Sequence, residues 1–146
     1  MNTNINMEQL QKDAVDIFNQ GFACSESVIY AIRKHFEVDI PDEAIAMSSG
    51  FPWGLGGGGC ICGALAGGTM CIGYFFGRTT PGDPKINRCF ELTNEFHDYF
   101  KEACLLSHSY KRHGEKFSGK KSTVQSLRRV NGKENRRNSY TGIKKG

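Results

Sequence analysis

The feature that most constrains this chain is residues 54–71, a segment with eight glycines and three cysteines in eighteen positions. No charged residue occurs between Glu43 and Arg78. Glycine lowers the stability of a helix interior by roughly 1 kcal/mol relative to alanine, so glycines inside a helix need another reason, such as a neighbour that approaches the backbone closely. An uncharged apolar stretch of this length is typical of a buried helix, which we place at residues 60–77.

Helical patterns also flank this segment. Apolar residues recur at spacings of three and four in residues 7–18, 24–36 and 86–106, and residues 38–51 indicate a loop followed by a short helix. No segment has the alternation of a strand. We therefore predict an all-α fold, a small helical bundle around a glycine-rich central helix.

Charge divides the chain into two parts. Residues 1–104 carry seven basic and thirteen acidic side chains, a net charge of −6, whereas residues 105–146 carry twelve and two, a net charge of +10. The second part has few aliphatic residues and scattered Gly, Ser and Asn, which predicts a disordered basic tail. We therefore predict a cysteine-containing helical domain at 1–104 and a tail of low order at 105–146. A solvated tail is a simpler interpretation than nucleic-acid binding, so we expect no nucleic-acid partner.

The cysteine content bears on the compartment. The chain has six cysteines, and its first residues have neither the basic start nor the apolar core of a secretory signal. We therefore expect a cytoplasmic protein, in which thiols are reduced by default and a cysteine cluster is more often redox-active or metal-binding than a structural crosslink. The central segment is rich in Gly and Ala and falls short of the ~20 strongly apolar residues that a membrane span needs, so we expect no membrane association.

Two cysteines are predicted at helix starts. Cys24 opens the segment 24–36, and Cys62 lies at the start of the central helix, each just after a glycine-containing turn. Unpaired N–H groups and the helix dipole stabilise a thiolate at such a position. We therefore predict Cys24 and Cys62 as the reactive thiols, whereas Cys71 and Cys89 lie among apolar residues and are assigned to packing.

The glycines around Cys62 predict close packing or a cofactor. Gly63 and Gly67 share one helical face, so a neighbouring helix or a bulky cofactor can approach the backbone there. With Gly59, they are the glycines we assign to a cofactor. Trp53, between a proline and the glycine run, is predicted to cap the core. The run also satisfies the G-x-G-x-x-G pattern, but no strand precedes it, so it is not evidence for nucleotide binding.

Three motifs carry a resemblance to a known family. Residues 62–67 read CGAxxG, the sequence GFACSESV surrounds Cys24, and Cys104 follows FHDYFKEA. At these motifs the chain resembles the C_GCAxxG_C_C family of redox-active proteins over roughly residues 10–104. The resemblance implies a helical domain with a redox or metal-centred role. The family has a fourth cysteine downstream, but no cysteine follows Cys104 here, and our hypothesis is that the chain beyond it is read out of frame.

Two chemistries remain open from these residues. The first is reversible dithiol–disulfide exchange or electron transfer by Cys24 and Cys62, with a redox partner protein whose identity the sequence does not give. The second is an iron–sulfur cluster or other metal centre held by Cys24, Cys62 and Cys104, with a fourth ligand from the missing segment. A homodimer is also left open, because small apolar helical domains often pair.

Overall fold

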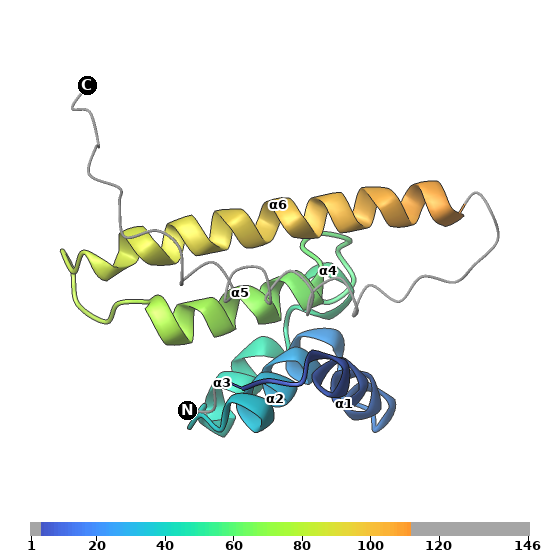
Figure 1. Ribbon diagram of the computed structural model, residues 1–146, viewed down its shortest axis with the longest axis horizontal. Coiled ribbons are helices and arrows are strands. Elements are labelled where there is room, and N and C mark those ends of the chain that lie inside the picture. Colours follow the sequence, from blue (N-terminus) through green and yellow to red (C-terminus); the bar gives the residue numbers. More distant parts are fainter. Residues whose placement is uncertain (1–3, 112–146) are drawn as a thin grey trace.

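The computed structural model describes residues 4–111, and of residues 104–111 it describes the helical backbone alone. The helices are α1 (Met7–Asn19), α2 (Cys24–Phe36), α3 (Asp42–Ser48), α4 (Pro52–Leu55), α5 (Gly63–Phe76) and α6 (Lys85–Lys111) (Figure 1). The described residues include no strand, which confirms the predicted all-α class.

Helix α5 lies at the centre of the bundle. It packs against α2 on one side and α6 on the other, while α1 and α3 pack against α2. Figure 1 shows α5 and α6 side by side, with α1, α2 and α3 grouped below α5. The glycine-rich helix is therefore central, as predicted.

Close approach explains two of the glycines inside α5. A Cβ on Gly67 would lie 2.5 Å from the carbonyl oxygen of Ser25 in α2, and a Cβ on Gly68 would lie 2.5 Å from the ring of Phe96 in α6. Alanine at either position would overlap an atom of the neighbouring helix, since a Cβ essentially never comes this close to another heavy atom. The glycines allow both neighbours to reach the α5 backbone.

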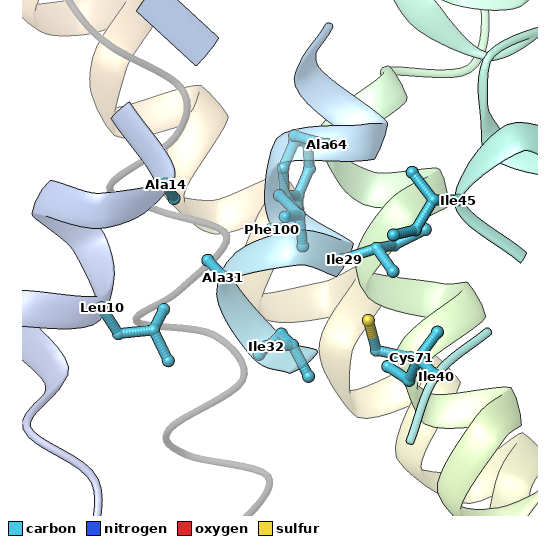
Figure 2. Close-up of a cluster of buried hydrophobic side chains, with 11 residues drawn as sticks. Leu10, Ala14, Ile29, Ala31, Ile32, Ile40, Ile45, Ala64, Cys71 and Phe100 are labelled. Carbon is cyan, nitrogen blue, oxygen red and sulfur yellow. The ribbon is translucent and has the colours of Figure 1, made fainter. Parts of the chain in front are cut away.

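The core forms where these helices meet. Its main cluster draws side chains from all helices except α4, together with one residue between α2 and α3 (Figure 2): Leu10, Ala14, Val28, Ile29, Ala31, Ile32, Ile40, Ile45, Ala64, Cys71 and Phe100. A smaller cluster of Ile72, Leu92 and Phe96 lies between α5 and α6. Burial of these apolar surfaces is the main force that holds the bundle together.

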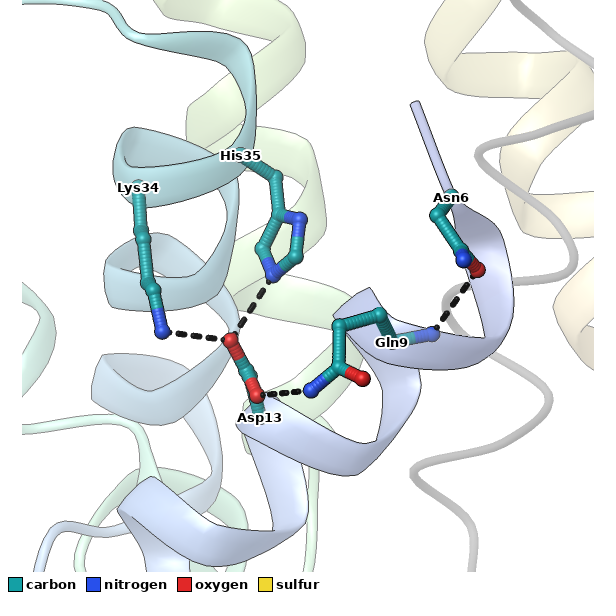
Figure 3. A network of polar contacts seen from close by, with 5 residues as sticks. All are labelled: Asn6, Gln9, Asp13, Lys34 and His35. Carbon is teal, nitrogen blue, oxygen red and sulfur yellow. Dashed lines mark hydrogen bonds and ion pairs between the residues drawn. The ribbon is translucent and has the colours of Figure 1, made fainter. Parts of the chain in front are cut away.

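Charged contacts fix the C-terminal end of α2. The Asp13 carboxylate of α1 accepts hydrogen bonds from Lys34 Nζ at 2.6 Å and Gln9 Nε2 at 2.8 Å, and its Oδ2 lies 2.9 Å from His35 Nε2 (Figure 3). Lys34 lowers the pKa of Asp13 to about 2, with the Gln9 amide and His35 acting in the same direction. On the other side of α2, Arg33 forms an ion pair with Asp42 at 2.5 Å.

Some boundaries differ from those predicted. Helix α5 begins at Gly63 instead of residue 60, because Cys62 immediately before it has an extended backbone, with ψ 127°, that is not helical. The short α4 was not predicted. Helix α6 continues past the predicted domain boundary to Lys111, and the remainder of the predicted tail, residues 112–146, lies outside the described residues. No helix in the described part of the chain has the length and apolar character needed to cross a membrane.

Candidate thiol site

Cys24 is the first residue of α2, and local hydrogen bonds explain why the helix begins there. Ala23 is extended and precedes the first turn. The Glu26 carboxylate accepts the Ala23 N–H at 2.6 Å, and the Ser27 hydroxyl donates to the Ala23 carbonyl at 2.8 Å. The first bond satisfies an N–H group that a helix start leaves unpaired, and the second gives the Ser27 hydroxyl an acceptor. The Cys24 side chain is half-buried, so its sulfur has a fixed place at the end of a well-formed helix.

Buried serines anchor this helix start to the end of α3. Ser25 and Ser48 are both fully buried. The Ser25 hydroxyl donates to the Ser48 carbonyl at 2.8 Å, and the Ser48 hydroxyl donates to the Ile45 carbonyl at 2.7 Å. Glu26 also accepts a hydrogen bond from the Ser49 hydroxyl. A buried network whose hydroxyl groups are all hydrogen-bonded is rigid. It therefore fixes the position of the helix start that carries Cys24.

Cys62 lies at the corresponding position of α5 but in different surroundings. It is the residue immediately before the helix, its side chain is exposed, and no side chain caps the start of α5. The first turn of α5 contains no acidic residue. The N–H groups of this turn thus face no competing carboxylate, and a helix start of this kind favours a neighbouring anion.

Gly63 brings the two predicted thiol positions together. A Cβ on Gly63 would overlap Cys24 Sγ and would lie 3.2 Å from Pro52 Cα and 3.3 Å from the Phe51 carbonyl oxygen. The Cys24 sulfur therefore lies against the residue that follows Cys62. The CGAxxG motif and the segment around Cys24 are packed onto each other, with Gly63 facing Cys24 and Gly67 facing Ser25.

The predicted cofactor glycines are placed differently from one another. At Gly63 and Gly67 the close neighbour is helix α2. The sequence had left two possibilities open at these glycines, a neighbouring helix or a cofactor, and the structure shows a helix. Gly59 lies in the loop before α5 with φ +88°, and its N–H donates to the Gly54 carbonyl at 3.0 Å. It helps to close this loop, and the space where its Cβ would lie is open.

The segment of residues 52–62, here named the thiol loop, folds back on itself beside the site. A Cβ on Gly54 would overlap the Cys60 nitrogen and lie 2.6 Å from the Gly59 carbonyl carbon. The loop exposes the thiols of Cys60 and Cys62. It also exposes Trp53, whose side chain is 76% accessible. The prediction that Trp53 caps the core is therefore wrong, and its left-handed backbone, with φ +54°, marks a turn that leaves the ring outside.

The remaining cysteines have separate roles. Cys71 is buried in the main core, and burial raises the pKa of its thiol to about 12, so it is a neutral, unreactive packing residue. Cys89 is half-buried against the smaller cluster between α5 and α6. The five cysteines whose side chains are described, Cys24, Cys60, Cys62, Cys71 and Cys89, are all free thiols. Packing is thus the observed environment of Cys71 and Cys89, as predicted.

The predicted metal ligands are only partly described. Cys104 lies in α6, but its side chain is outside the described residues. Among the side chains that are described, no three His, Cys, Asp or Glu residues converge as a metal site requires. The described residues therefore do not by themselves fit a four-thiolate iron–sulfur cluster.

Comparison with known proteins adds one finding. A family model described as "Putative redox-active protein (C_GCAxxG_C_C)" matches residues 22–138. No curated protein and no solved structure matches the chain. The match begins just before Cys24 and continues well beyond Cys104, where we expected the resemblance to end because the cysteines end there. The out-of-frame hypothesis for the residues after Cys104 stays a prediction.

Proposed function

Because this chain belongs to the C_GCAxxG_C_C family of redox-active proteins, we propose that it exchanges thiols and disulfides through Cys62 and Cys24. The observation that carries the proposal is the contact at Gly63, where the absence of a side chain lets the Cys24 sulfur lie against the residue next to Cys62. Cys24 opens α2 and Cys62 immediately precedes α5 at this contact, which supports the proposal that the two thiols form one disulfide with each other.

The surroundings of the two thiols support different roles. Cys62 is exposed at an uncapped helix start without acidic neighbours in the first turn, which suits an attacking thiolate. Cys24 is half-buried with its sulfur against Gly63, so a partner reaches it less readily than it reaches Cys62. We assign Cys62 as the attacking thiol and Cys24 as the resolving thiol.

The reaction then follows two exchange steps. The Cys62 thiolate attacks one sulfur of a partner disulfide, the partner S–S bond breaks, and the other partner sulfur leaves as a thiolate. Cys24 loses its proton to solvent and attacks the Cys62 sulfur in the mixed disulfide. The bond between Cys62 and the partner breaks, the partner leaves as a dithiol, and a Cys24–Cys62 disulfide remains. Two electrons pass from the protein to the partner, and the reverse sequence oxidises a partner dithiol.

Thiol titration of single-cysteine variants tests this assignment. Mild oxidation of the reduced wild-type protein is expected to remove two thiols reversibly, and Cys24→Ser or Cys62→Ser is expected to abolish that loss. Cys60→Ser is the matched control, because Cys60 is an exposed thiol in the same loop. Cys24→Ser should also accumulate a mixed disulfide that Cys62→Ser does not form. Loss of the reversible pair in Cys60→Ser alone would contradict the proposal.

Metal analysis of the same anaerobic sample tests the second chemistry. Cys24, Cys62 and Cys104 are soft ligands of the kind that iron–sulfur clusters use, with a fourth ligand still to be found. Iron with acid-labile sulfide in the wild-type protein would contradict dithiol exchange and indicate a cluster-centred function. The Cys104→Ser protein should then lose both the iron and the reversible change in the number of titratable thiols. A metal-free protein with two reversible thiols is the expected result.

A further inference from the structure

Large exposed apolar side chains lie in the same loop as the exposed thiols. Trp53, Leu55 and Ile61, here named the apolar rim, are 76%, 60% and 45% accessible. The loop closes through the Gly59 N–H, which donates to the carbonyls of Trp53 at 3.3 Å and Gly54 at 3.0 Å. This closure holds the segment that contains Trp53 against the segment that leads into Cys60, so one closed loop carries both the rim and the two thiols.

The backbone of the rim is unfavourable for the residues it carries. Trp53 and Leu55 have φ of +54° and +50°, a region that bulky side chains rarely occupy and glycine occupies readily. Glycines are abundant in the same loop, yet these two positions carry large apolar residues in water. Large exposed apolar groups beside a reactive group are typical of a surface that another molecule covers.

Charge indicates the kind of molecule. No Asp, Glu, Lys, Arg or His occurs between Glu43 and Arg78, so neither the thiol loop nor α5 supplies a charged side chain. The acid at the start of α2, Glu26, adds a negative charge beside Cys24. Glutathione disulfide carries several carboxylates, for which the uncharged apolar rim offers no charged partner. An uncharged apolar polypeptide does complement it.

We propose that the partner is a polypeptide that presents its disulfide within an uncharged apolar segment, and that the apolar rim binds this segment while Cys62 attacks the disulfide. The inference rests on the proposed function, since it takes Cys62 as the attacking thiol. Trp53 and Leu55 contribute binding and take no part in the exchange.

Competition between two disulfides tests the partner class. In the Cys24→Ser protein, a short uncharged peptide whose disulfide is flanked by Leu and Phe is expected to react with Cys62 at least about tenfold faster than glutathione disulfide. Trp53→Ser and Leu55→Ser are each expected to reduce the peptide rate severalfold and leave the glutathione rate unchanged. Phe90→Ser, which removes a 65% accessible side chain from α6, is the matched control and should change neither rate.

The single tryptophan supplies an independent readout. Since Trp53 is the only tryptophan of the chain, its emission reports the rim alone and should shift to shorter wavelength when the apolar peptide binds. Equal rates for the two disulfides, or peptide rates unaffected by both rim variants, would overturn the inference while leaving dithiol exchange intact. Failure of Cys62 to react with either disulfide would instead overturn the proposed function. An emission shift caused by higher protein concentration without peptide would assign the rim to a second copy of the chain. A shift caused by phosphatidylcholine vesicles without peptide would assign it to a lipid surface. Either result would overturn the inference.

Discussion

At the start of α2, Cys24 is half-buried above a network of buried serines, whereas at the start of α5, Cys62 is exposed beside a loop rich in glycine. Both cysteines lie at a helix N-terminus that follows a glycine-containing turn, so their local sequences are similar. The difference lies in what surrounds each helix start. Exchange needs one thiol that a partner can reach and another whose position is fixed, and the two helix starts divide these requirements between them.

The largest expected effect comes from separating α2 and α5 where the α2 backbone lies against Gly67. In Gly67→Ala the new Cβ would lie 2.5 Å from the Ser25 carbonyl oxygen and 3.0 Å from Ser25 Cα. Both are backbone atoms that no side-chain rotation can move, so we expect a loss of about 1–3 kcal/mol in the free energy of unfolding, measured by urea denaturation. The separation should also lower the yield of the Cys24–Cys62 disulfide.

Gly73→Ala is the matched control for this substitution. Gly73 lies in the same helix, and a Cβ there would meet nothing within 4 Å. Alanine should therefore stabilise α5 by up to about 1 kcal/mol through its higher helix propensity. Equal stability of the two variants would show that α2 does not approach α5 as closely as described, and the comparison of the two helix starts would lose its basis.

A smaller effect is expected when the support of Cys24 is weakened without moving α5. Ser25→Ala removes the buried hydrogen bond to the Ser48 carbonyl, which keeps a second donor in the Phe51 N–H at 3.1 Å. We expect a loss of about 1 kcal/mol in the free energy of unfolding. Alkylation of Cys24 in the native protein should become faster, while alkylation of Cys62 should not change.

Ser49→Ala is the control for the buried serine. The Ser49 hydroxyl also donates to the start of α2, through Glu26, but its side chain is exposed. Its removal should change the free energy of unfolding by less than that of Ser25. If Ser25→Ala accelerates both thiols equally, the serine network supports the whole site and not Cys24 in particular.

Much of the helix pattern was predictable from the sequence, because apolar spacing and glycine or proline stops are local signals. Residues 24–36 were predicted as a helix, and α2 has the same bounds. The start of α5 was misplaced by three residues, since nothing in the sequence Cys60-Ile61-Cys62 marks Cys62 as the extended residue before the helix. Helix α6 also continues beyond residue 106, where the predicted pattern ended, and this continuation was missed because residues 107–111 are polar and extend no apolar spacing.

The contacts within the site depend on tertiary packing, which local patterns do not encode. The cysteines at helix starts were predicted, but the overlap of Gly63 with the Cys24 sulfur depends on how α2 crosses α5. Ser25 and Ser48 are more than twenty residues apart, and nothing in the local sequence distinguishes either from a solvent-exposed helical serine. Their hydrogen bond depends on the packing of α2 against α3. Trp53 was assigned to the core from its place between Pro52 and the glycine run, but its left-handed backbone leaves the side chain outside.

The smallest expected effect concerns the far end of α2, where charge takes the place of buried serines. Asp13, 12% accessible, contacts Lys34 and His35, and its pKa is lowered from 3.8 to about 2. A lowered folded-state pKa means that the carboxylate stabilises the fold above about pH 3.8, and that this stabilisation is lost as the pH falls through 2. Asp13→Asn should therefore lower the free energy of unfolding by about 1 kcal/mol or less at pH 7, because charge pairs near a surface are weak.

The pH dependence distinguishes this carboxylate from an ordinary surface charge. The difference between wild type and Asp13→Asn, measured by urea denaturation from pH 7 to pH 2, should shrink below pH 4 and vanish near pH 2. Glu91→Gln removes an exposed ion pair with Arg88 at 2.7 Å and should have little effect at any pH. A difference for Asp13→Asn that stays constant down to pH 2 would mean that Asp13 acts by packing and neutral hydrogen bonds. Charge would then not hold this end of α2, and both ends would depend on buried polar contacts of the kind that Ser25 makes.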